Sequence, residues 1–424
     1  MVTIADSPRV LDAHASRVWL RRFARTTAGV VVLIAIVVST ACIVGGLATG
    51  AALNARITEQ RAVLENTEPF AYAAQNLYAA LSATDAAAAT AFLSGGSQTP
   101  LTRARYQQAL AAAASALADA TAGSPDMATR QALAGISAKL ATYTGLVEAA
   151  RANNVQGFPI GSAYLREASS LMQTSLLPAA AKVFTDDLAR VDEGQREVGR
   201  PPVVGLLLLG IAVAAIVVGS VVLFRRTNRQ FNIGLVVAAA VVIVAIGWVV
   251  VATRLAAADI ERSRVDGTAK IEQLAEARIL AQQARTDETL QLITRGNITA
   301  SEKAFFGYTD DLLARLGTGS PAAAAAVESW VAGHRRQVDA YLAGDYETAV
   351  EQALSAERGG SAAQFGTVES ILREDIESTR ATLRVKVADA GRYLAWTPTG
   401  TLVLTIVAAA AAVVGLWPRL KEFL

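Results

Sequence analysis

Acidic side chains occur in adjacent pairs at three places, Asp186-Asp187, Asp310-Asp311 and Glu374-Asp375. Two carboxylates that face one substrate can divide the work of a general acid and a general base. Each pair lies in a stretch predicted to be helical, where neighbouring side chains point about 100° apart. Adjacent carboxylates are therefore poorly placed to act on the same atom, and we interpret all three pairs as solvated faces of helices.

A second cluster combines basic and aromatic side chains in His334-Arg335-Arg336, followed by Tyr341 and Tyr346. Guanidinium groups beside tyrosine hydroxyl groups are suited to binding an acidic ligand. The same pattern describes a solvent-facing basic patch beside aromatic residues of the core. We favour the patch and keep the ligand site as the alternative.

The remaining basic residues of interest lie in three short segments, 1–25, 225–230 and 418–424, with net charges of +3, +3 and +1. As a set they form a candidate contact surface for a partner protein. The alternative is that they only fix membrane topology and touch anionic lipid headgroups. The residues of this set are Arg17, Arg21, Arg22, Arg225, Arg226, Arg229, Arg419 and Lys421.

Motifs for catalysis are absent from the sequence. It has no glycine-rich phosphate loop before a basic helix, no histidine-containing metal motif, and no Ser or Cys paired with a nearby His. His14 and His334 lie in different segments, and the single cysteine, Cys42, lies inside an apolar run, which excludes a disulfide framework. We expect a protein without enzymatic activity, cofactor or metal.

Composition narrows the class further. The chain has 424 residues, of which 53% are hydrophobic and 18% charged, a mixture expected for membrane spans joined to soluble helical domains. The segment 54–200 has 12 basic and 13 acidic residues, and 254–398 has 17 and 21. Nucleic-acid binding would need basic folded domains, so it is not expected.

Four apolar runs must position these residues: 26–53, 203–224, 231–253 and 398–417. Each is long enough to cross the hydrocarbon core, which takes about 20 residues. The loop 225–230 carries three arginines and no acid, so it is predicted to be cytoplasmic, together with the N-terminal segment 1–25 and the tail 418–424. The first run exceeds the apolar core of a signal peptide, about 7–15 residues, and is read as an uncleaved span.

The segments 54–200 and 254–397 are then extracytoplasmic. Apolar residues at helical spacing, interrupted by Gly-Gly, Gly-Asn and Ser-Pro, predict two four-helix bundles and an all-α fold. Thr84-Asp85 before Gly95-Gly96 matches Thr286-Asp287 before Gly296-Asn297, and Ser124-Pro125 matches Ser320-Pro321. We interpret the halves as a duplication; two convergent alanine-rich hairpins are the alternative.

Each external domain resembles the four-helix-bundle sensor modules of bacterial chemoreceptors and sensor kinases. The resemblance rests on Thr84-Asp85 followed by Phe92-Leu93-Ser94-Gly95-Gly96, which is similar to the end of their first helix. It covers two helices in each half. The sequence departs from these receptors after the second span, where 225–230 stands in place of a HAMP linker, kinase or methyl-accepting region.

The full-length plan is similar to the actinobacterial GlnX family: basic N-terminus, span, helical domain, two-span hairpin, second helical domain, span and short tail. The alanine-rich, arginine-rich composition and the end Gly415-Leu416-Trp417-Pro418-Arg419-Leu420-Lys421-Glu422-Phe423 agree with it. This resemblance implies a bacterial plasma-membrane protein that links an extracytoplasmic amino-acid-binding lipoprotein of the GlnH type to the soluble Ser/Thr kinase PknG. It implies no site residue.

Together these observations predict a non-enzymatic transmembrane signal relay in contact with membrane lipid. Two alternatives stay open, a direct small-molecule sensor with a pocket in one bundle, and a structural scaffold of the envelope. Alanine-rich bundles with a narrow apolar stripe often associate further, so a homodimer is one option.

Overall fold

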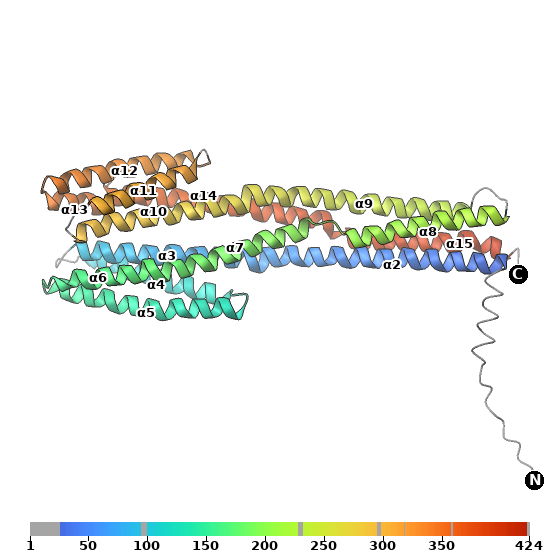
Figure 1. The fold of residues 1–424 in the computed structure, drawn as a ribbon, viewed down its shortest axis with the longest axis horizontal. Coiled ribbons are helices and arrows are strands. Elements are labelled where there is room, and N and C mark those ends of the chain that lie inside the picture. The colour runs from blue at the N-terminus through green and yellow to red at the C-terminus, as the bar shows by residue number, and fades with distance from the viewer. Residues whose placement is uncertain are drawn as a thin grey trace, which may run out of the picture. The chain divides into compact units, whose positions relative to one another are not determined.

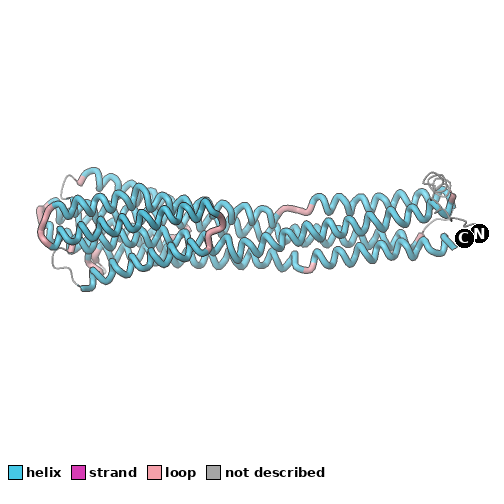
Figure 2. Tube along the Cα trace, turned by 90° about the horizontal axis from the view of Figure 1, so that it is seen from below, coloured by secondary structure: helices cyan, strands magenta, loops and turns pink. Residues whose placement is uncertain are grey.

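The computed structural model describes residues 26–94, 100–227, 232–294, 298–317, 319–357 and 359–421. These residues form helices and connecting turns, and none of them lies in a strand (Figure 2), which confirms the all-α prediction. The chain divides into two compact units. The first, called the apolar unit, holds the described residues of Met1–Glu59, Glu197–Asp259 and Asp389–Leu424. The second, the polar unit, holds Gln60–Arg196 and Ile260–Ala388.

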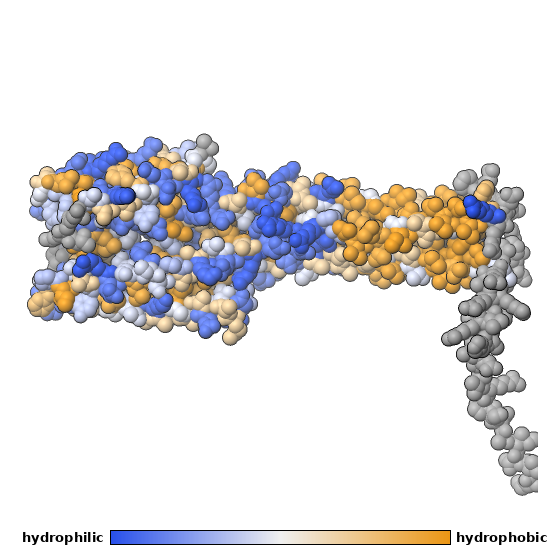
Figure 3. Space-filling model, viewed as in Figure 1, coloured by the Kyte–Doolittle hydropathy of each residue, from blue (hydrophilic) through white to orange (hydrophobic). Residues whose placement is uncertain are grey.

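Four helices are long and apolar enough to cross a membrane, as the sequence predicted. Their apolar parts lie side by side (Figure 1) around a core that includes Val38, Leu209, Val242 and Ala408. Outside that core, the visible face of the unit is almost continuously hydrophobic (Figure 3), which suits helices in contact with lipid. These helices are α2 (Thr27–Ala62), α8 (Val203–Thr227), α9 (Ile233–Ser263) and α15 (Thr397–Lys421).

Glycines allow the helices of the apolar unit to approach closely. A side chain at Gly46 of α2 would collide with Thr405 of α15. Gly234 of α9 and Gly415 of α15 face each other with their backbones in contact, and the side-chain amide of Asn232 donates to the Gly415 carbonyl at 2.9 Å. Small residues thus bring α15 against both α2 and α9.

The first half of the polar unit, residues 60–196, contains a helical hairpin, a third helix and a long returning helix. Its elements are the π-helical turn η1 (Val63–Thr67), α3 (Glu68–Leu93), α4 (Pro100–Ala122), α5 (Met127–Val155), α6 (Ile160–Leu171), the π-helical turn η3 (Met172–Leu176) and α7 (Leu177–Gly199). Ser124-Pro125 precedes the third helix and does not lie in its first turn. The helix begins after Asp126, whose carboxylate accepts the Thr129 amide N–H at 2.7 Å.

The second half, residues 260–388, runs through a similar succession, with one additional short helix and with no counterpart of η3 among its described residues. Its elements are η4 (Arg264–Thr268), α10 (Ala269–Thr294), α11 (Thr299–Leu316), α12 (Pro321–Leu342), α13 (Tyr346–Leu354) and α14 (Ser361–Ala395). Pro321 stands in the first turn of its helix, where a missing amide N–H costs nothing. The common order of elements is an observation, and duplication as its origin stays a prediction. The matched glycines Gly95, Gly96 and Gly296 lie outside the described residues.

Proline explains two of the three π-helical turns in the described residues. Pro69 and Pro178 each stand two positions after a π-turn, η1 and η3 respectively. A proline lacks an amide N–H, and its ring collides with the carbonyl of the residue four positions earlier, so the preceding turn widens instead of closing as an α-turn. η4 has no such proline and instead contains Gly267, which packs against Leu383 of α14.

Candidate functional site

A buried carboxylate, Asp85 of α3, lies in the core of the first half. Its Oδ1 accepts a hydrogen bond from the Tyr143 hydroxyl at 3.1 Å, and its Oδ2 accepts one from the Ser169 hydroxyl at 2.8 Å. The side-chain amide of Gln173 donates to the same Oδ2 at 3.3 Å. These partners belong to α5, α6 and η3, so one carboxylate joins the helices of this half. Among the described residues, no cation pairs with it.

Burial raises the pKa of Asp85 above its ordinary value, and the hydrogen bonds from Ser169, Tyr143 and Gln173 act against that rise. Burial also raises the pKa of Tyr143, and the negative charge of Asp85 raises it further. The phenol therefore stays protonated and remains a donor. A carboxylate held only by neutral donors favours its protonated form more than an exposed aspartate does.

The second half buries a carboxylate of its own, Glu288 of α10. Its Oε2 accepts hydrogen bonds from the Arg285 guanidinium at 2.5 Å and from the Trp330 indole N–H at 3.1 Å. Its Oε1 accepts one from the Ser361 hydroxyl and lies 3.2 Å from His334 Nδ1. Helices α12 and α14 supply these last three partners, as α5, α6 and η3 do for the first half.

His334 continues this network, because its Nε2 lies 2.9 Å from a carboxylate oxygen of Glu302. Its ring is stacked on Phe305, with centroids 3.7 Å apart. Burial by itself lowers the pKa of His334, but contact with Glu288 and Glu302 outweighs burial and raises it to about 9. Burial raises the pKa of Glu288, but Arg285 and His334 outweigh it and lower the value to about 2. The second half therefore holds its carboxylate charged and neutralised by cations.

A polar layer joins the two halves near η1. Glu68 of α3, a buried carboxylate, is bound by two arginines of α14, Arg380 and Arg384. Arg384 also donates to the Leu64 carbonyl of η1 at 3.1 Å, and the Arg380 guanidinium lies over the Tyr72 ring, 3.8 Å from its centroid. The two guanidinium groups balance the charge of this buried carboxylate, so removal of both would leave it buried and unpaired.

A second group of contacts joins the halves at η4. The Arg264 guanidinium donates to Asp192 of α7 at 2.7 Å, and this contact raises the pKa of Arg264. The buried Gln195 accepts from the Thr268 hydroxyl at 2.8 Å and donates to the Ser263 hydroxyl at 3.0 Å. The side-chain oxygen and the side-chain nitrogen of Gln195 each form a hydrogen bond to the other half.

The third crossing contact involves η3. Gln173, which already donates to Asp85, also lies 3.4 Å from the Thr286 hydroxyl of α10. Each π-turn in the described residues therefore carries at least one hydrogen bond to the opposite half of the polar unit. π-turns are rare and occur often at functional positions. We take these three turns and the buried carboxylates beside them as the candidate site.

The structure separates the residues of the predicted basic and aromatic cluster. His334 lies in the core, so its interpretation as part of a solvent-facing patch was wrong. Arg335 and Arg336 are exposed; the first lies 5.7 Å from the centroid of the Phe306 ring, and the second donates to the Gly359 carbonyl. Tyr341 and Tyr346 form an edge-on pair with centroids 6.4 Å apart. These residues do not converge on one pocket.

Of the basic residues predicted to contact a partner, Arg17, Arg21, Arg22 and Arg229 lie outside the described residues. Arg225 is exposed near the end of α8, Arg226 follows it in the same helix, and Arg419 and Lys421 stand in the last turn of α15. Figure 1 places these two helix ends together within the apolar unit.

The three acidic pairs differ in how far their side chains are buried. Asp310, Asp311, Glu374 and Asp186 are exposed, as interpreted from the sequence. Asp187 was expected on a solvated face, but it is buried, and burial raises its pKa to about 6 despite a hydrogen bond from Arg190. The buried carboxylates Asp85, Glu68 and Glu288 were not predicted as site residues.

Comparison with known proteins gives one match. Residues 59–196 match the actinobacterial sensor domain family, which corresponds to the first half of the polar unit and to about a third of the chain. No curated protein and no solved structure matches the chain. The matched range begins just before η1 and ends in α7, so it contains Glu68, and Asp85 with its partners Tyr143, Ser169 and Gln173.

Proposed function

We propose that this chain is a non-enzymatic transmembrane signalling protein in which the π-turns of the polar unit carry the signal. The observation behind this proposal is that η1, η3 and η4 each hold a hydrogen bond to the opposite half. Converting a π-turn to an α-turn changes the register of the helix by one residue, a rotation of about 100° and a rise of about 1.5 Å. Since the turns share partners across the halves, a register change in one helix alters contacts in the other half.

The match to an actinobacterial sensor domain and the four membrane-capable helices support a sensing role at a membrane. Under our proposal the polar unit is extracytoplasmic, the protein lies in the plasma membrane, and both termini are cytoplasmic. The input is an amino-acid-binding lipoprotein of the GlnH type, and the output is a cytoplasmic Ser/Thr kinase of the PknG type. Similarity of the plan to the GlnX family supports these partners, as do the basic residues Arg225, Arg419 and Lys421 at one end of the apolar unit.

A crosslinking pull-down of the intact protein from native membranes, with and without added aspartate, glutamate or glutamine, tests the partners. We expect recovery of both a solute-binding lipoprotein and a soluble kinase, with amounts that change on addition of the amino acid. If neither partner is recovered, the relay is wrong, and a self-contained sensor or a scaffold takes its place.

The role of the π-turns is tested in the same assay with two matched variants. Thr268→Val removes the hydroxyl that donates to Gln195 and keeps the shape of the side chain. Thr382→Val removes an exposed hydroxyl on α14 that bonds only within its own helix. We expect the ligand-dependent change in recovery to diminish in the first variant and to persist in the second. Equal behaviour of the two variants would contradict a role for η4.

A further inference from the structure

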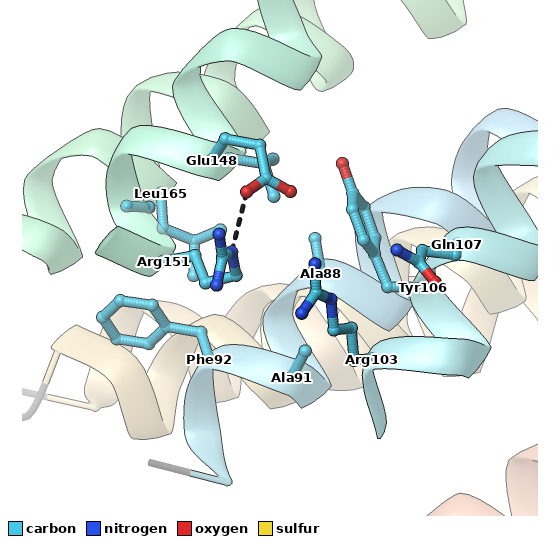
Figure 4. Close-up of a pocket in the computed structure, with 11 residues that line it drawn as sticks. Ala88, Ala91, Phe92, Arg103, Tyr106, Gln107, Glu148, Arg151 and Leu165 are labelled. Carbon is cyan, nitrogen blue, oxygen red and sulfur yellow. Dashed lines mark hydrogen bonds and ion pairs between the residues drawn. The ribbon is translucent and has the colours of Figure 1, made fainter. Parts of the chain in front are cut away.

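A pocket opens in the first half where α3, α4, α5 and α6 meet. Ala88 and Phe92 of α3 form part of its apolar wall, and five polar side chains from α4 and α5 stand around it: Arg103, Tyr106, Gln107, Glu148 and Arg151. Figure 4 shows the Tyr106 hydroxyl and the Glu148 carboxylate toward one side of the opening, and the guanidinium groups of Arg103 and Arg151 toward the other.

Two of these polar side chains bind each other. Arg151 donates to Glu148 at 2.7 Å. Arg103, which is exposed, makes no hydrogen bond or ion pair to any described residue, and the Tyr106 hydroxyl is buried without an acceptor. Tyr106 as a whole is only 6% exposed. A buried donor without an acceptor is unfavourable, so a ligand acceptor that reaches this hydroxyl would recover free energy.

We propose that this pocket binds the carboxylate group of a small organic acid, with Arg103 and the Tyr106 hydroxyl as its donors. The enclosed part measures about 20 Å³, enough for one water-sized group, so the rest of the ligand lies in the open part beside Phe92. A single unpaired cation beside a resident carboxylate, Glu148, favours a monoanion over a dianion such as phosphate. The apolar wall favours a short hydrocarbon group attached to the carboxylate.

The state of Tyr106 agrees with its assignment as a donor. Burial, with the negative charges of Glu148 and Asp85 as further causes, raises its pKa to about 12, so its hydroxyl keeps its proton at neutral pH. The hydroxyl is out of contact with solvent in this structure, so binding requires a small opening of the pocket.

Such an opening would act on the network already described. Ala88 follows Asp85 by one turn of α3, and Asp85 reaches Thr286 of the second half through Gln173. Occupancy of the pocket is therefore in a position to change contacts at η3. This inference goes beyond the proposed function, because it assigns a ligand to the chain itself and needs no partner protein.

The test uses the purified full-length chain in lipid nanodiscs, with isobutyrate as the probe and titration calorimetry as the readout. Isobutyramide has the same shape without the charge, and inorganic phosphate supplies a dianion without the apolar group. We expect saturable binding of isobutyrate and none of the other two. Binding of isobutyramide with equal affinity, or no saturable binding of isobutyrate, would overturn the proposal.

Variants locate the site. Arg103→Gln removes the unpaired cation and should weaken isobutyrate binding about tenfold or more, since hydrogen bonds to charged groups are the stronger ones. Tyr106→Phe should weaken it by a smaller factor. Arg105→Gln is the matched control, because Arg105 is exposed on the same helix and does not line the pocket. Unchanged affinity in Arg103→Gln would contradict the assigned site. The calorimetry contains no partner protein, so a negative result here would contradict the ligand site alone and would not contradict the relay tested by the pull-down.

Discussion

The two halves of the polar unit each bury a carboxylate on their first long helix, and they stabilise it in different ways. Asp85 is held by a tyrosine, a serine and a glutamine, all neutral. Glu288 is held by an arginine and by a histidine whose pKa is raised to about 9. A buried carboxylate without a cation keeps its desolvation penalty. When a buried carboxylate is paired with a cation, removal of that cation strongly lowers the stability of the fold.

This difference suggests a division of labour between the halves. The second half has a charge-balanced core that resists change. The first half has an unbalanced carboxylate, two proline-linked π-turns and a pocket with an unsatisfied tyrosine hydroxyl. It is also the half that matches the sensor domain family. We expect the first half to respond and the second to serve as its rigid partner.

The largest predicted effect is that of removing the charge of the second-half carboxylate. Glu288→Gln leaves Arg285 and His334 buried beside a neutral amide, and should lower the free energy of unfolding of that half by about 3–5 kcal/mol. Trp330 donates to Glu288 and is the only tryptophan in the polar unit's sequence. Its fluorescence therefore reports unfolding of this half in a background with Trp19, Trp248, Trp396 and Trp417 replaced by phenylalanine.

The matched change in the first half is Asp85→Asn. It removes a charge that no cation balances, so only the hydrogen bonds to this side chain are weakened. The free energy of unfolding should fall by about 1 kcal/mol. Hydrogen exchange resolved to peptides of each half measures both variants in the same full-length protein. If Asp85→Asn costs as much as Glu288→Gln, the contrast between a balanced and an unbalanced core is wrong.

The two halves should also differ in how their stability depends on pH. The pKa of His334 is raised to about 9 from an ordinary value of 6.5, so its contribution to stability is complete below about pH 6.5 and is lost as the pH rises through 9. The shift corresponds to about 3 kcal/mol. In the first half, burial raises the pKa of Asp187 to about 6 and that of Tyr106 to about 12, so neither titrates strongly between these limits.

Hydrogen exchange corrected for its intrinsic pH dependence is the measurement. Between pH 6.5 and 9 the second half should lose protection as His334 loses its proton. His334→Gln should remove this slope. A slope of the same size in both halves, or one that persists in His334→Gln, would show that another group controls the pH response.

The fold was largely predictable from the sequence, because each decisive signal is local. Apolar runs without charge define the membrane-capable helices, and helical spacing between glycine and proline breaks defines the rest. A proline inside a helix, such as Pro69, predicts a local disturbance, but whether it produces a kink or a π-turn depends on how the neighbouring helices pack. Pro178 stands in the same relation to η3 and was not singled out. The sequence around Gly267 contains no pattern that predicts the π-turn η4.

The site was much less predictable, because burial of a polar residue depends on which face of its helix meets the core. His334 and the two arginines after it are adjacent in sequence, yet successive positions differ by about 100°, so the histidine faces inward and the arginines face solvent. Asp85 was noted as part of a helix-end pattern and not as a buried group. Its partners, Tyr143 and Ser169, are far away in sequence, and no local signal joins them.

The next prediction concerns η4, the π-turn without a proline. A side chain added at Gly267 would place its Cβ 2.9 Å from Leu383 Cβ, so Gly267→Ala should lower stability by about 1–3 kcal/mol through overpacking. Gly145→Ala in α5 is the control, because nothing lies within 4 Å of that position. Alanine should there raise stability by about 0.5–1 kcal/mol. The unfolding temperatures of the two variants in nanodiscs should shift in opposite directions. An unchanged unfolding temperature in Gly267→Ala would show that η4 accommodates the added methyl group without loss of stability.

The smallest predicted effect compares the starts of the third helices. Asp126 caps α5 by accepting the Thr129 amide N–H, and Asp126→Ala should cost about 1 kcal/mol and expose the first turn to exchange. Ser320 stands at the equivalent place before α12, but its hydroxyl donates to Asp375 of α14 at 2.5 Å. Ser320→Ala should therefore cost a similar amount without raising exchange in the first turn of α12. Similar local exchange in both variants would mean that the two starts are stabilised alike, and that the halves differ only in their cores.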